Sequence, residues 1–341
     1  MRDRRLRWRT LAAVAATSTI LLAAGCSGDG ADEPDPVSVE PLAGVSSPET
    51  STTPAGSITA SPSGIHFTTF DNATRSVLAL DDSFSNLLVF DTSDSRAEPR
   101  TIALKGEAAA IVAPGDGTVV LPMNGSLTRV DIGDSKVTST KVEANLLSAA
   151  VLEDGRTAVG DDRGSVHILE QDGTESQTIN GLTSVDALAS TMYGLTALDR
   201  DQTSVTVVDI DKGSLGIALR AGEGAAELAT DRFGRILVTD ATGEELLVFS
   251  SDDLLLRQRF PVDAQPWAVT YDNQSDVVWI SVPAINEVVG YTLDTGIPVE
   301  VSRFPTVRQP DSLAIDAATG DLLVGSAAGE GLQRIAVGDG R

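Results

Sequence analysis

Residues 267–302 read WAVTYDNQSDVVWISVPAINEVVGYTLDTGIPVEVS, and this stretch decides the fold. Four runs rich in valine, isoleucine and tyrosine alternate in it with turn-forming residues, at 267–271, 277–282, 288–293 and 298–302. Such runs predict β-strands, and the short turns between them predict an antiparallel meander. A four-stranded meander of about 40 residues is the repeating unit of a β-propeller.

The third of these strands recurs along the rest of the chain as a short apolar run that usually ends in Asp or another small polar residue. The copies are LLVFD, LTRVD, VHILE, VTVVD, LLVFS, VVGYT and LQRIA, ending at residues 91, 131, 170, 209, 250, 292 and 336. They are 39 to 44 residues apart, and no amphipathic helix of useful length lies between them. We therefore predict an all-β fold, a seven-bladed β-propeller over residues 55–341. A ring of six or eight blades, or a pair of stacked sandwiches, is the alternative.

The seventh unit has one strand too few. It holds strand-like runs near 312–315, 321–325 and 332–337, and the sequence then ends. An open ring would leave unpaired strand edges. We therefore predict that a segment before the first blade, AGSITA at 55–60, supplies the missing strand.

The N-terminus has the three parts of an export signal. Five arginines lie in residues 2–9, an uncharged apolar run follows at Leu11–Ala24, and the small residues Ala24 and Gly25 precede Cys26. The apolar run is shorter than the roughly 20 residues that a membrane-spanning helix needs, but it fits a signal peptide over residues 1–25. Leu22, Ala23, Ala24 and Gly25 before Cys26 resemble the lipobox of bacterial lipoproteins. That resemblance implies that the thiol of Cys26 carries a diacylglyceryl anchor.

Residues 26–54 are rich in Ser, Thr, Pro, Asp and Glu, and we predict a disordered tether there. Cys26 is the only cysteine of the chain, so neither an intramolecular disulfide nor a disulfide-linked partner is expected. The predicted location is the extracytoplasmic face of the cell membrane. Lipid at Cys26 would hold the protein there, because two acyl chains anchor stably where one does not.

Composition excludes several classes of function. The formal net charge is −24, and it becomes more negative once the arginine-rich residues 1–25 are removed, which argues against a nucleic-acid partner. The only histidines are His66 and His167, so metal sites built on several His or Cys residues are excluded. The sequence contains neither a phosphate-binding glycine loop nor a nucleophile elbow, and no catalytic residue is assigned.

Carboxylates keep one enzymatic alternative open. The loops of one propeller face carry a predicted acidic rim, with Asp311 in the wider set that shares this face. The residues singled out are Asp81, Asp82, Asp161, Asp162, Asp199, Asp201, Asp240 and Glu287. Oxygen ligands suit Ca²⁺, and propeller lactonases similar to gluconolactonase hold Ca²⁺ at the channel mouth. Acidic residues are equally frequent in the opposite turns, which favours solubility over a focused metal site. No cofactor is expected, with Ca²⁺ as the alternative.

Two units resemble the YVTN-type propeller repeat of bacterial surface proteins. The sixth reads PWAVTYD at 266–272, NEVV at 286–289 and DTG at 294–296, and the seventh begins with PDSLAID at 310–316. With its export signal, the chain resembles the actinobacterial propeller lipoproteins (the LppL-like family). The resemblance implies a membrane-anchored binding or scaffold module for a cell-envelope protein, a peptide or a small ligand. A Ca²⁺-dependent hydrolase or lactonase is the alternative.

Overall fold

The computed structural model describes residues 38, 40–94 and 97–337. These residues belong to one compact unit that spans Pro36–Arg341. The predicted signal peptide, the lipobox residues Leu22, Ala23, Ala24 and Gly25, and the lipidation site Cys26 lie outside the described residues. Within the described part of the chain, no helix has the length and apolar character needed to cross a membrane.

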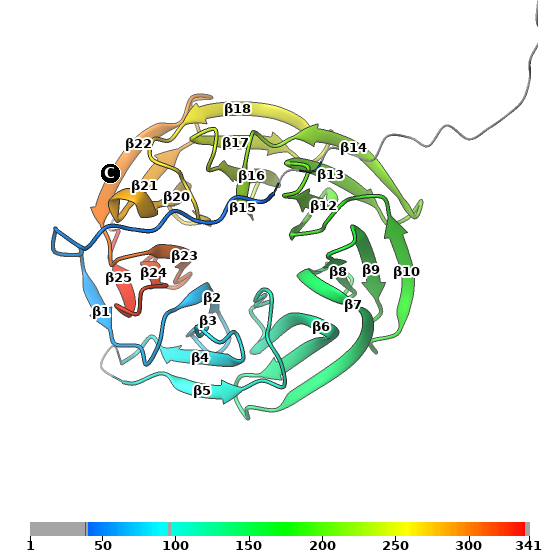
Figure 1. Ribbon diagram of the computed structural model, residues 1–341, viewed down its shortest axis with the longest axis horizontal. Helices are drawn as coiled ribbons and strands as arrows, with labels where there is room; N and C mark the ends of the chain where they lie inside the picture. The colour runs from blue at the N-terminus through cyan, green and yellow to red at the C-terminus, as the bar shows by residue number, and fades with distance from the viewer. Residues whose placement is uncertain (1–37, 39, 95–96, 338–341) are drawn as a thin grey trace, which may run out of the picture. The chain divides into compact units, whose positions relative to one another are not determined.

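The described unit is an all-β propeller whose sheets surround a central opening (Figure 1). Antiparallel sheets follow one another around the ring in chain order, as the meander pattern predicted. The first two sheets are β2 (His66–Asp71), β3 (Ser76–Leu80), β4 (Asn86–Asp91) and β5 (Arg100–Ala103), then β6 (Thr118–Asp131), β7 (Val137–Val151), β8 (Thr157–Asp161), β9 (Ser165–Leu169) and β10 (Glu175–Asn180).

Four further sheets complete the ring, each with four strands. The third sheet contains β11 (Ala187–Thr191), β12 (Gly194–Asp199), β13 (Ser204–Asp209) and β14 (Ser214–Arg220). The fourth contains β15 (Ala225–Thr230), β16 (Arg235–Asp240), β17 (Glu245–Ser250) and β18 (Leu255–Pro261). The fifth contains β19 (Val269–Asp272), β20 (Val277–Val282), β21 (Glu287–Thr292) and β22 (Val299–Pro305), with the short 3-10 helix η1 (Pro283–Ile285) between β20 and β21. The sixth contains β23 (Pro310–Ile315), β24 (Leu322–Ser326), β25 (Leu332–Ile335) and β1 (Ser57–Thr59).

The strands thus form six hydrogen-bonded sheets, not the seven expected from the repeat. The difference arises at β7, which is continuous for 15 residues. Its first part, up to Asn145, pairs with β6, and its second part, from Leu146, pairs with β8. No glycine or proline interrupts β7, so nothing in the local sequence ends the strand where one unit was expected to give way to the next.

β6 itself folds back within its 14 residues. The N–H of Ile132, just after β6, donates to the carbonyl of Gly117, just before it, over 2.9 Å. The reversal lies at Asn124–Gly125, where Gly125 has a φ of 79°, a conformation that glycine adopts without steric cost. Bridges from Ala108 to Met123 and from Val112 to Val120 add a further, irregular segment beside β6.

The core lies between neighbouring sheets. Every residue of β3, β8, β20 and β24 is buried, because these strands lie inside their sheets and are covered on both faces by the sheets beside them. Strands covered on both faces read as continuous apolar runs, such as VVWISV in β20. The outer strands β14, β18 and β22 are mainly exposed.

The ring closes with the strand predicted to close it. β1 lies within the segment 55–60 and pairs antiparallel with β25, with Ser57 opposite Arg334 and Thr59 opposite Leu332. A side-chain amide reinforces the pairing: Gln333 Nε2 donates to the carbonyl of Ala55 over 2.8 Å. The last sheet therefore takes its outer strand from the start of the propeller and its other three from the end.

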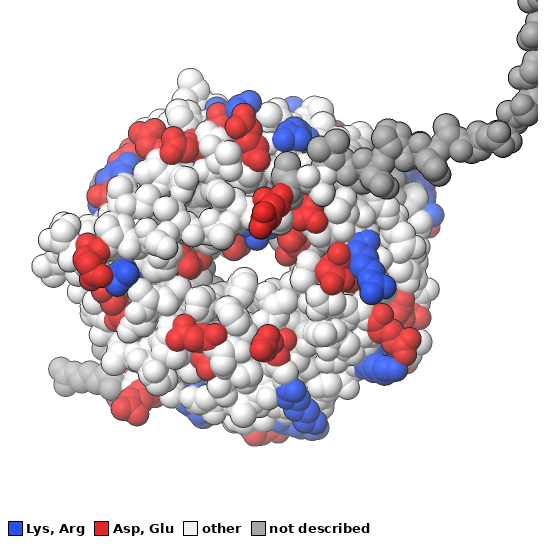
Figure 2. Space-filling model, viewed as in Figure 1, with Lys and Arg blue, Asp and Glu red and all other residues white. Residues whose placement is uncertain are grey.

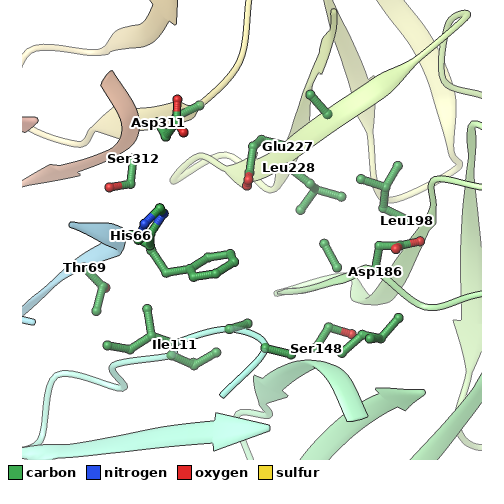
Figure 3. Close-up of a pocket in the computed structure, with 18 of the residues that line it drawn as sticks. His66, Thr69, Ile111, Ser148, Asp186, Leu198, Glu227, Leu228, Asp311 and Ser312 are labelled. Atoms are coloured by element: carbon green, nitrogen blue, oxygen red, sulfur yellow. The ribbon is translucent and has the colours of Figure 1, made fainter. Parts of the chain in front are cut away.

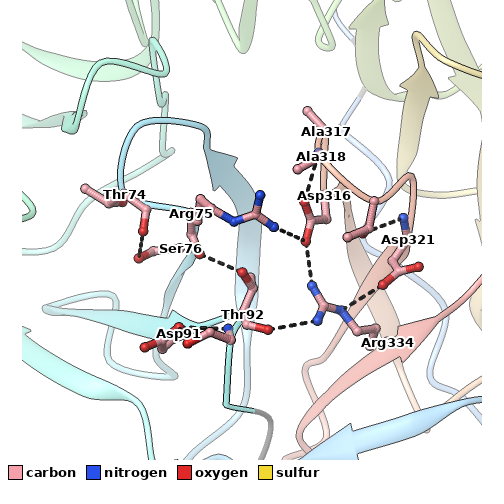
Figure 4. A network of polar contacts seen from close by, with 12 residues as sticks. Thr74, Arg75, Ser76, Asp91, Thr92, Asp316, Ala317, Ala318, Asp321 and Arg334 are labelled. Atoms are coloured by element: carbon pink, nitrogen blue, oxygen red, sulfur yellow. Dashed lines mark hydrogen bonds and ion pairs between the residues drawn. The ribbon is translucent and has the colours of Figure 1, made fainter.

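An ionic network joins the last sheet to the first (Figure 4). Arg334 in β25 donates to Asp316 Oδ2 over 2.6 Å and to the carbonyl of Thr92 over 3.0 Å, which places it between β23 and β4. Arg75, at the start of β3, lies 3.7 Å from the same carboxylate oxygen. Asp316 is fully buried. We call Arg75, Thr92, Asp316, Asp321 and Arg334 the closure seam.

The described end of the predicted tether is packed, so the expectation of a disordered linker fails at residues 42–50. We call these residues the strap; they cross one face of the ring beside the central opening, as the blue segment of Figure 1 shows. Three side chains of the propeller donate hydrogen bonds to backbone carbonyls of the strap. Arg200 Nη2 donates to Leu42 over 2.7 Å, Gln309 Nε2 donates to Val45 over 2.9 Å, and Asn286 Nδ2 donates to Pro48 over 2.9 Å.

Ser47 fixes the middle of the strap. It is 5% exposed, and its hydroxyl donates to the carbonyl of Pro283 and accepts from the N–H of Gln309. Hydrogen bonds from propeller side chains to backbone carbonyls thus hold the strap at several points along its length.

Candidate functional site

The innermost strands of the sheets surround a cavity of about 510 Å³ on the axis of the ring (Figure 3). These strands are rich in alanine and other small residues, as in AAAI at 108–111, SAAV at 148–151 and AAELA at 225–229. Small side chains leave open space near the axis that bulkier residues would fill. Cavities of this size accept small ligands or part of a peptide.

The wall of the cavity is divided by polarity. Polar side chains come from the starts of inner strands: His66 from β2, Glu227 from β15 and Asp311 from β23, with Asp186 directly before β11. Apolar groups complete the lining, and they include Phe67, Ile111, Leu147, Leu188, Leu228 and Trp267. Figure 2 shows acidic residues beside the central opening and also around the outer edge of the visible face.

Glu227 is the most perturbed acid of the cavity. Burial raises the pKa of its carboxyl to about 7; nearby Asp311 acts in the same direction, and Arg200 opposes the shift. Within the part of the chain that the structure describes, no hydrogen bond or ion pair to this carboxylate is present, and Figure 3 shows it directed into the cavity. Part of the Glu227 side chain is accessible to solvent, and this accessible part faces the cavity.

Asp311 is the second acid with a raised pKa. Burial is the main cause, while a hydrogen bond from Gln309 and the charge of His66 act in the opposite direction. Gln309 Nε2 donates to Asp311 Oδ1 over 2.8 Å, and the same amide nitrogen binds the strap. His66 is held by Asp82, whose Oδ1 lies 3.2 Å from Nε2.

Arg200 is the only Lys or Arg residue of the cavity wall, and protein groups occupy two of its donors. Its Nε donates to the carbonyl of Ala225 over 3.1 Å and its Nη2 to that of Leu42 in the strap. The guanidinium lies over the ring of Trp267, 5.6 Å from its centre. Gly44 of the strap lies against the same indole ring. Arg200 thus connects the cavity to the strap.

Three members of the predicted acidic rim turn inward. Asp161, Asp199 and Asp240 are at most 4% exposed. Each accepts backbone N–H groups of the turns around it: Asp240, for example, accepts from Glu223 (2.8 Å), Gly224 (2.8 Å) and Gly243 (2.9 Å). Their oxygen atoms are used to hold loops in place.

The other rim members are spread over separate loops. Asp81 accepts from Asn86 and Ser83, Asp82 from the N–H of Gly64, Asp162 from Asn145, and Glu287 from Arg303. Asp201 has a raised pKa because of burial and the nearby charges of Asp186 and Asp199. Among the described residues no three Asp, Glu, His or Cys side chains converge in a way that could hold a metal ion.

The residues that line the cavity are mostly not those predicted from the sequence. Asp311 belonged to the wider rim set, but Glu227, Asp186 and Arg200 were not assigned. The available signal was a single carboxylate in an otherwise small and apolar strand, AAELAT at 225–230. A charged residue at such a position is costly unless a function or a partner retains it.

Comparisons with known proteins define the fold and no more. No protein-family profile matches the chain, and no curated protein sequence matches it. Among solved structures it is similar to Kuenenia stuttgartiensis hydrazine synthase, with a TM-score of 0.69 and 13% identity over 84% of this chain and 97% of that one. It is also similar to a chain of the mitotic checkpoint complex (TM-score 0.71, 14% identity, 87% and 99% covered) and to streptogramin B lyase (TM-score 0.67, 11% identity, 83% and 96% covered). Because the functions of these proteins differ and the identities are low, the likeness is one of fold alone.

Proposed function

We propose that this chain is an extracytoplasmic lipoprotein whose propeller binds a ligand in its central cavity. The observation that carries the proposal is the cavity itself, where an unpaired carboxylate and apolar walls face the same space. Binding sites combine these features, since apolar contact supplies affinity and a few polar groups supply specificity. Either a small ligand or the side chain of a peptide from the cell envelope fits this description.

We also propose that the ring has the seven-fold plan of the sequence repeat. The five-stranded sheet then corresponds to two blades that share β7. The reversal of β6 at Asn124–Gly125 and the divided pairing of β7 support this count. The bridges at Ala108 and Val112 would be the remnant of an inner strand in the second blade.

The cavity can be tested as the binding site by filling it. Thr69 lines the cavity and is partly exposed, whereas Ile217 lies on the outer strand β14 with 58% exposure. We expect native mass spectrometry of the full chain, extracted from host membranes in a non-ionic detergent, to show a bound small molecule or peptide. The Thr69→Trp variant would lose it and Ile217→Trp would keep it. Identical spectra for both variants and the original protein would refute binding in the cavity.

The lipid anchor has a separate test at Cys26. If the lipobox resemblance is correct, Cys26→Ser removes the only thiol that can be acylated. We then expect the protein in the medium or as an unprocessed precursor, because loss of both acyl chains abolishes stable anchoring. Fractionation followed by intact-mass measurement checks this result. Processed protein that stays in the membrane would contradict the anchor.

A Ca²⁺-dependent hydrolase or lactonase is less well supported. The proposal needs several oxygen ligands around one point, and Ca²⁺ takes six to eight of them. The rim carboxylates are instead divided among separate turns, where backbone N–H groups bind Asp161, Asp199 and Asp240 and side chains bind Asp162 and Glu287. Calorimetric titration with Ca²⁺ distinguishes the two functions: a lactonase requires measurable heat and a raised melting temperature at millimolar metal.

A further inference from the structure

We propose that the ligand of the central cavity is an amphipathic cation, a protonated amine joined to an apolar group, with the ammonium held at Glu227. This inference rests on the proposed binding function and adds the chemical class of the ligand. It follows from three properties of the cavity: the sign of its charge, the free carboxylate of Glu227, and the apolar wall opposite.

The charge of the cavity selects a cation. Three carboxylates, from Asp186, Glu227 and Asp311, belong to its lining, against one guanidinium at Arg200 and the imidazole of His66. The guanidinium is held in place by two backbone carbonyls and by the face of Trp267. A bound anion would lie close to the three carboxylates that line the cavity, and like charges repel one another.

The carboxylate of Glu227 has no hydrogen-bond donor or cation bound to it among the described residues, unlike the other two carboxylates of the cavity. Asp186 accepts from the N–H of Arg200 over 2.8 Å, and Asp311 accepts from Gln309. Glu227 has no comparable contact among the described residues, and Arg200 forms no ion pair with it although both line the cavity. A carboxylate so placed is costly in its charged form, which an ammonium group within hydrogen-bonding distance would stabilise.

The rest of the cavity wall is largely apolar and could contact the apolar group of the ligand. Ile111 lies across the cavity from Glu227 and Asp311, as Figure 3 shows. Phe67 is 36% exposed beside this space and contacts Phe84 with ring centres 6.1 Å apart. Burial of an aliphatic or aromatic group here would supply affinity, and the carboxylates would set its orientation.

Three probes that share a phenylethyl group and differ in charge test the proposal. The full chain in a non-ionic detergent is titrated with 2-phenylethylamine, 2-phenylethanol and 3-phenylpropionate, with binding followed by calorimetry at pH 8. We expect the amine to bind at least about tenfold more tightly than the alcohol, with no binding of the carboxylate. Glu227→Gln should remove the preference for the amine.

A matched control separates the site from the general negative charge of the protein. Glu223→Gln removes a carboxylate four residues away that is exposed outside the cavity lining. This variant should bind the amine as the original protein does. Equal loss in both variants would overturn the proposal, because it would show attraction by net charge. Unchanged melting temperatures in both variants exclude misfolding as the cause.

The dependence on pH provides a second readout. The groups that face Glu227 are Arg200, Asp311, Asp186 and His66. Since Glu227 has a pKa of about 7, its charged form is lost as the pH falls through 7, while the amine stays protonated. Affinity for the amine should therefore fall between pH 8 and pH 6, and by less in Glu227→Gln, where only the other groups titrate.

The outcomes distinguish this inference from the proposed function. If the alcohol and the amine bind equally, and Thr69→Trp abolishes both, the cavity binds ligands but the cation preference is wrong. If no probe binds at millimolar concentration, the inference is overturned. The proposed function then depends on the mass-spectrometry result alone.

Discussion

At the scale of single residues, aspartates explain why the repeat is visible in the sequence. Asp91, Asp131 and Asp209 end the third strand of a unit, and each accepts N–H groups from the turn that follows, as in Ser93 N–H to Asp91 Oδ1 over 2.8 Å. An Asp side chain that binds the backbone two or three residues ahead stabilises a tight turn. The recurring Asp therefore marks the end of a strand and carries no catalytic meaning.

The buried aspartates at the end of the second strand have a larger effect on stability. Asp240 is fully buried and accepts three backbone N–H groups of two separate loops. We expect Asp240→Ala to lower the free energy of unfolding by about 3 kcal/mol, because buried donors would lose their acceptor. Urea denaturation measures the change. Asp294→Ala, at an exposed turn, is the control and should leave the midpoint unchanged; equal midpoints for both variants would contradict the argument.

At the scale of elements, much of the fold could be predicted because its strands are punctuated. Turn residues and apolar runs located nearly every strand, and the need for closure located β1 in residues 55–60. The continuity of β7 could not be predicted, because KVEANLL at 141–147 contains no Gly or Pro that would end the strand, and its Asn145 is compatible with either a turn or a strand. Packing of β7 against its neighbouring strands determines whether the strand continues through this segment.

The candidate site was harder to predict than the strands. The sequence pattern of a strand indicates which of its residues are buried, but it does not show which side chains of distant strands face a common axis. Glu227 and Asp186 were missed for this reason. The strap was missed because its partners Arg200, Asn286 and Gln309 lie more than 150 residues away, and they bind backbone carbonyls that every sequence possesses.

The closing strand depends on one glycine. Gly56 has a φ of 72°, and a Cβ atom there would lie 2.0 Å from the carbonyl oxygen of Arg334 in the paired strand. We expect Gly56→Val to displace β1 and to lower the melting temperature by several degrees. Deletion of residues 50–63 should lower it further. Gly106→Val is the control, since no atom lies within 4 Å of its Cβ position. Identical melting curves for Gly56→Val and Gly106→Val would count against closure by β1.

At the scale of the whole molecule, the strap couples the N-terminal segment to the face of the ring. Gln309 is central to this attachment: its side chain binds Val45 and Ser47, and it also binds Asp311 of the cavity. We expect Gln309→Ala to increase hydrogen exchange of strap amides by at least about tenfold, because a release of about 1.4 kcal/mol corresponds to a factor of ten. Exchange in the buried strand β20 should not change. Equal protection of the strap in both proteins would show that Gln309 does not hold it.

The ring as a whole is held shut at the closure seam. The chain passes from each sheet into the next, and between the last and first sheets it does so through β1, which leads into β2. This junction therefore depends on the non-covalent pairing of β1 with β25, where the two ends of the propeller meet. Arg334 stabilises this junction, since it binds Asp316 and Asp321 of its own sheet and the carbonyl of Thr92 in the first. The carboxylate of Asp316 is fully buried, and the guanidinium groups of Arg334 and Arg75 lie beside it.

Removal of Arg334 should therefore weaken the whole ring. We expect Arg334→Met to lower the free energy of unfolding by about 2 kcal/mol, less than a fully buried pair would lose, because Arg334 is partly exposed and Arg75 stays near Asp316. Asp316→Asn in the same chain should restore part of the loss, since it removes the unpaired charge. Arg220→Met, at the exposed end of β14, is the control. If chemical denaturation gives equal midpoints for Arg334→Met and Arg220→Met, pairing of β1 with β25 alone closes the ring.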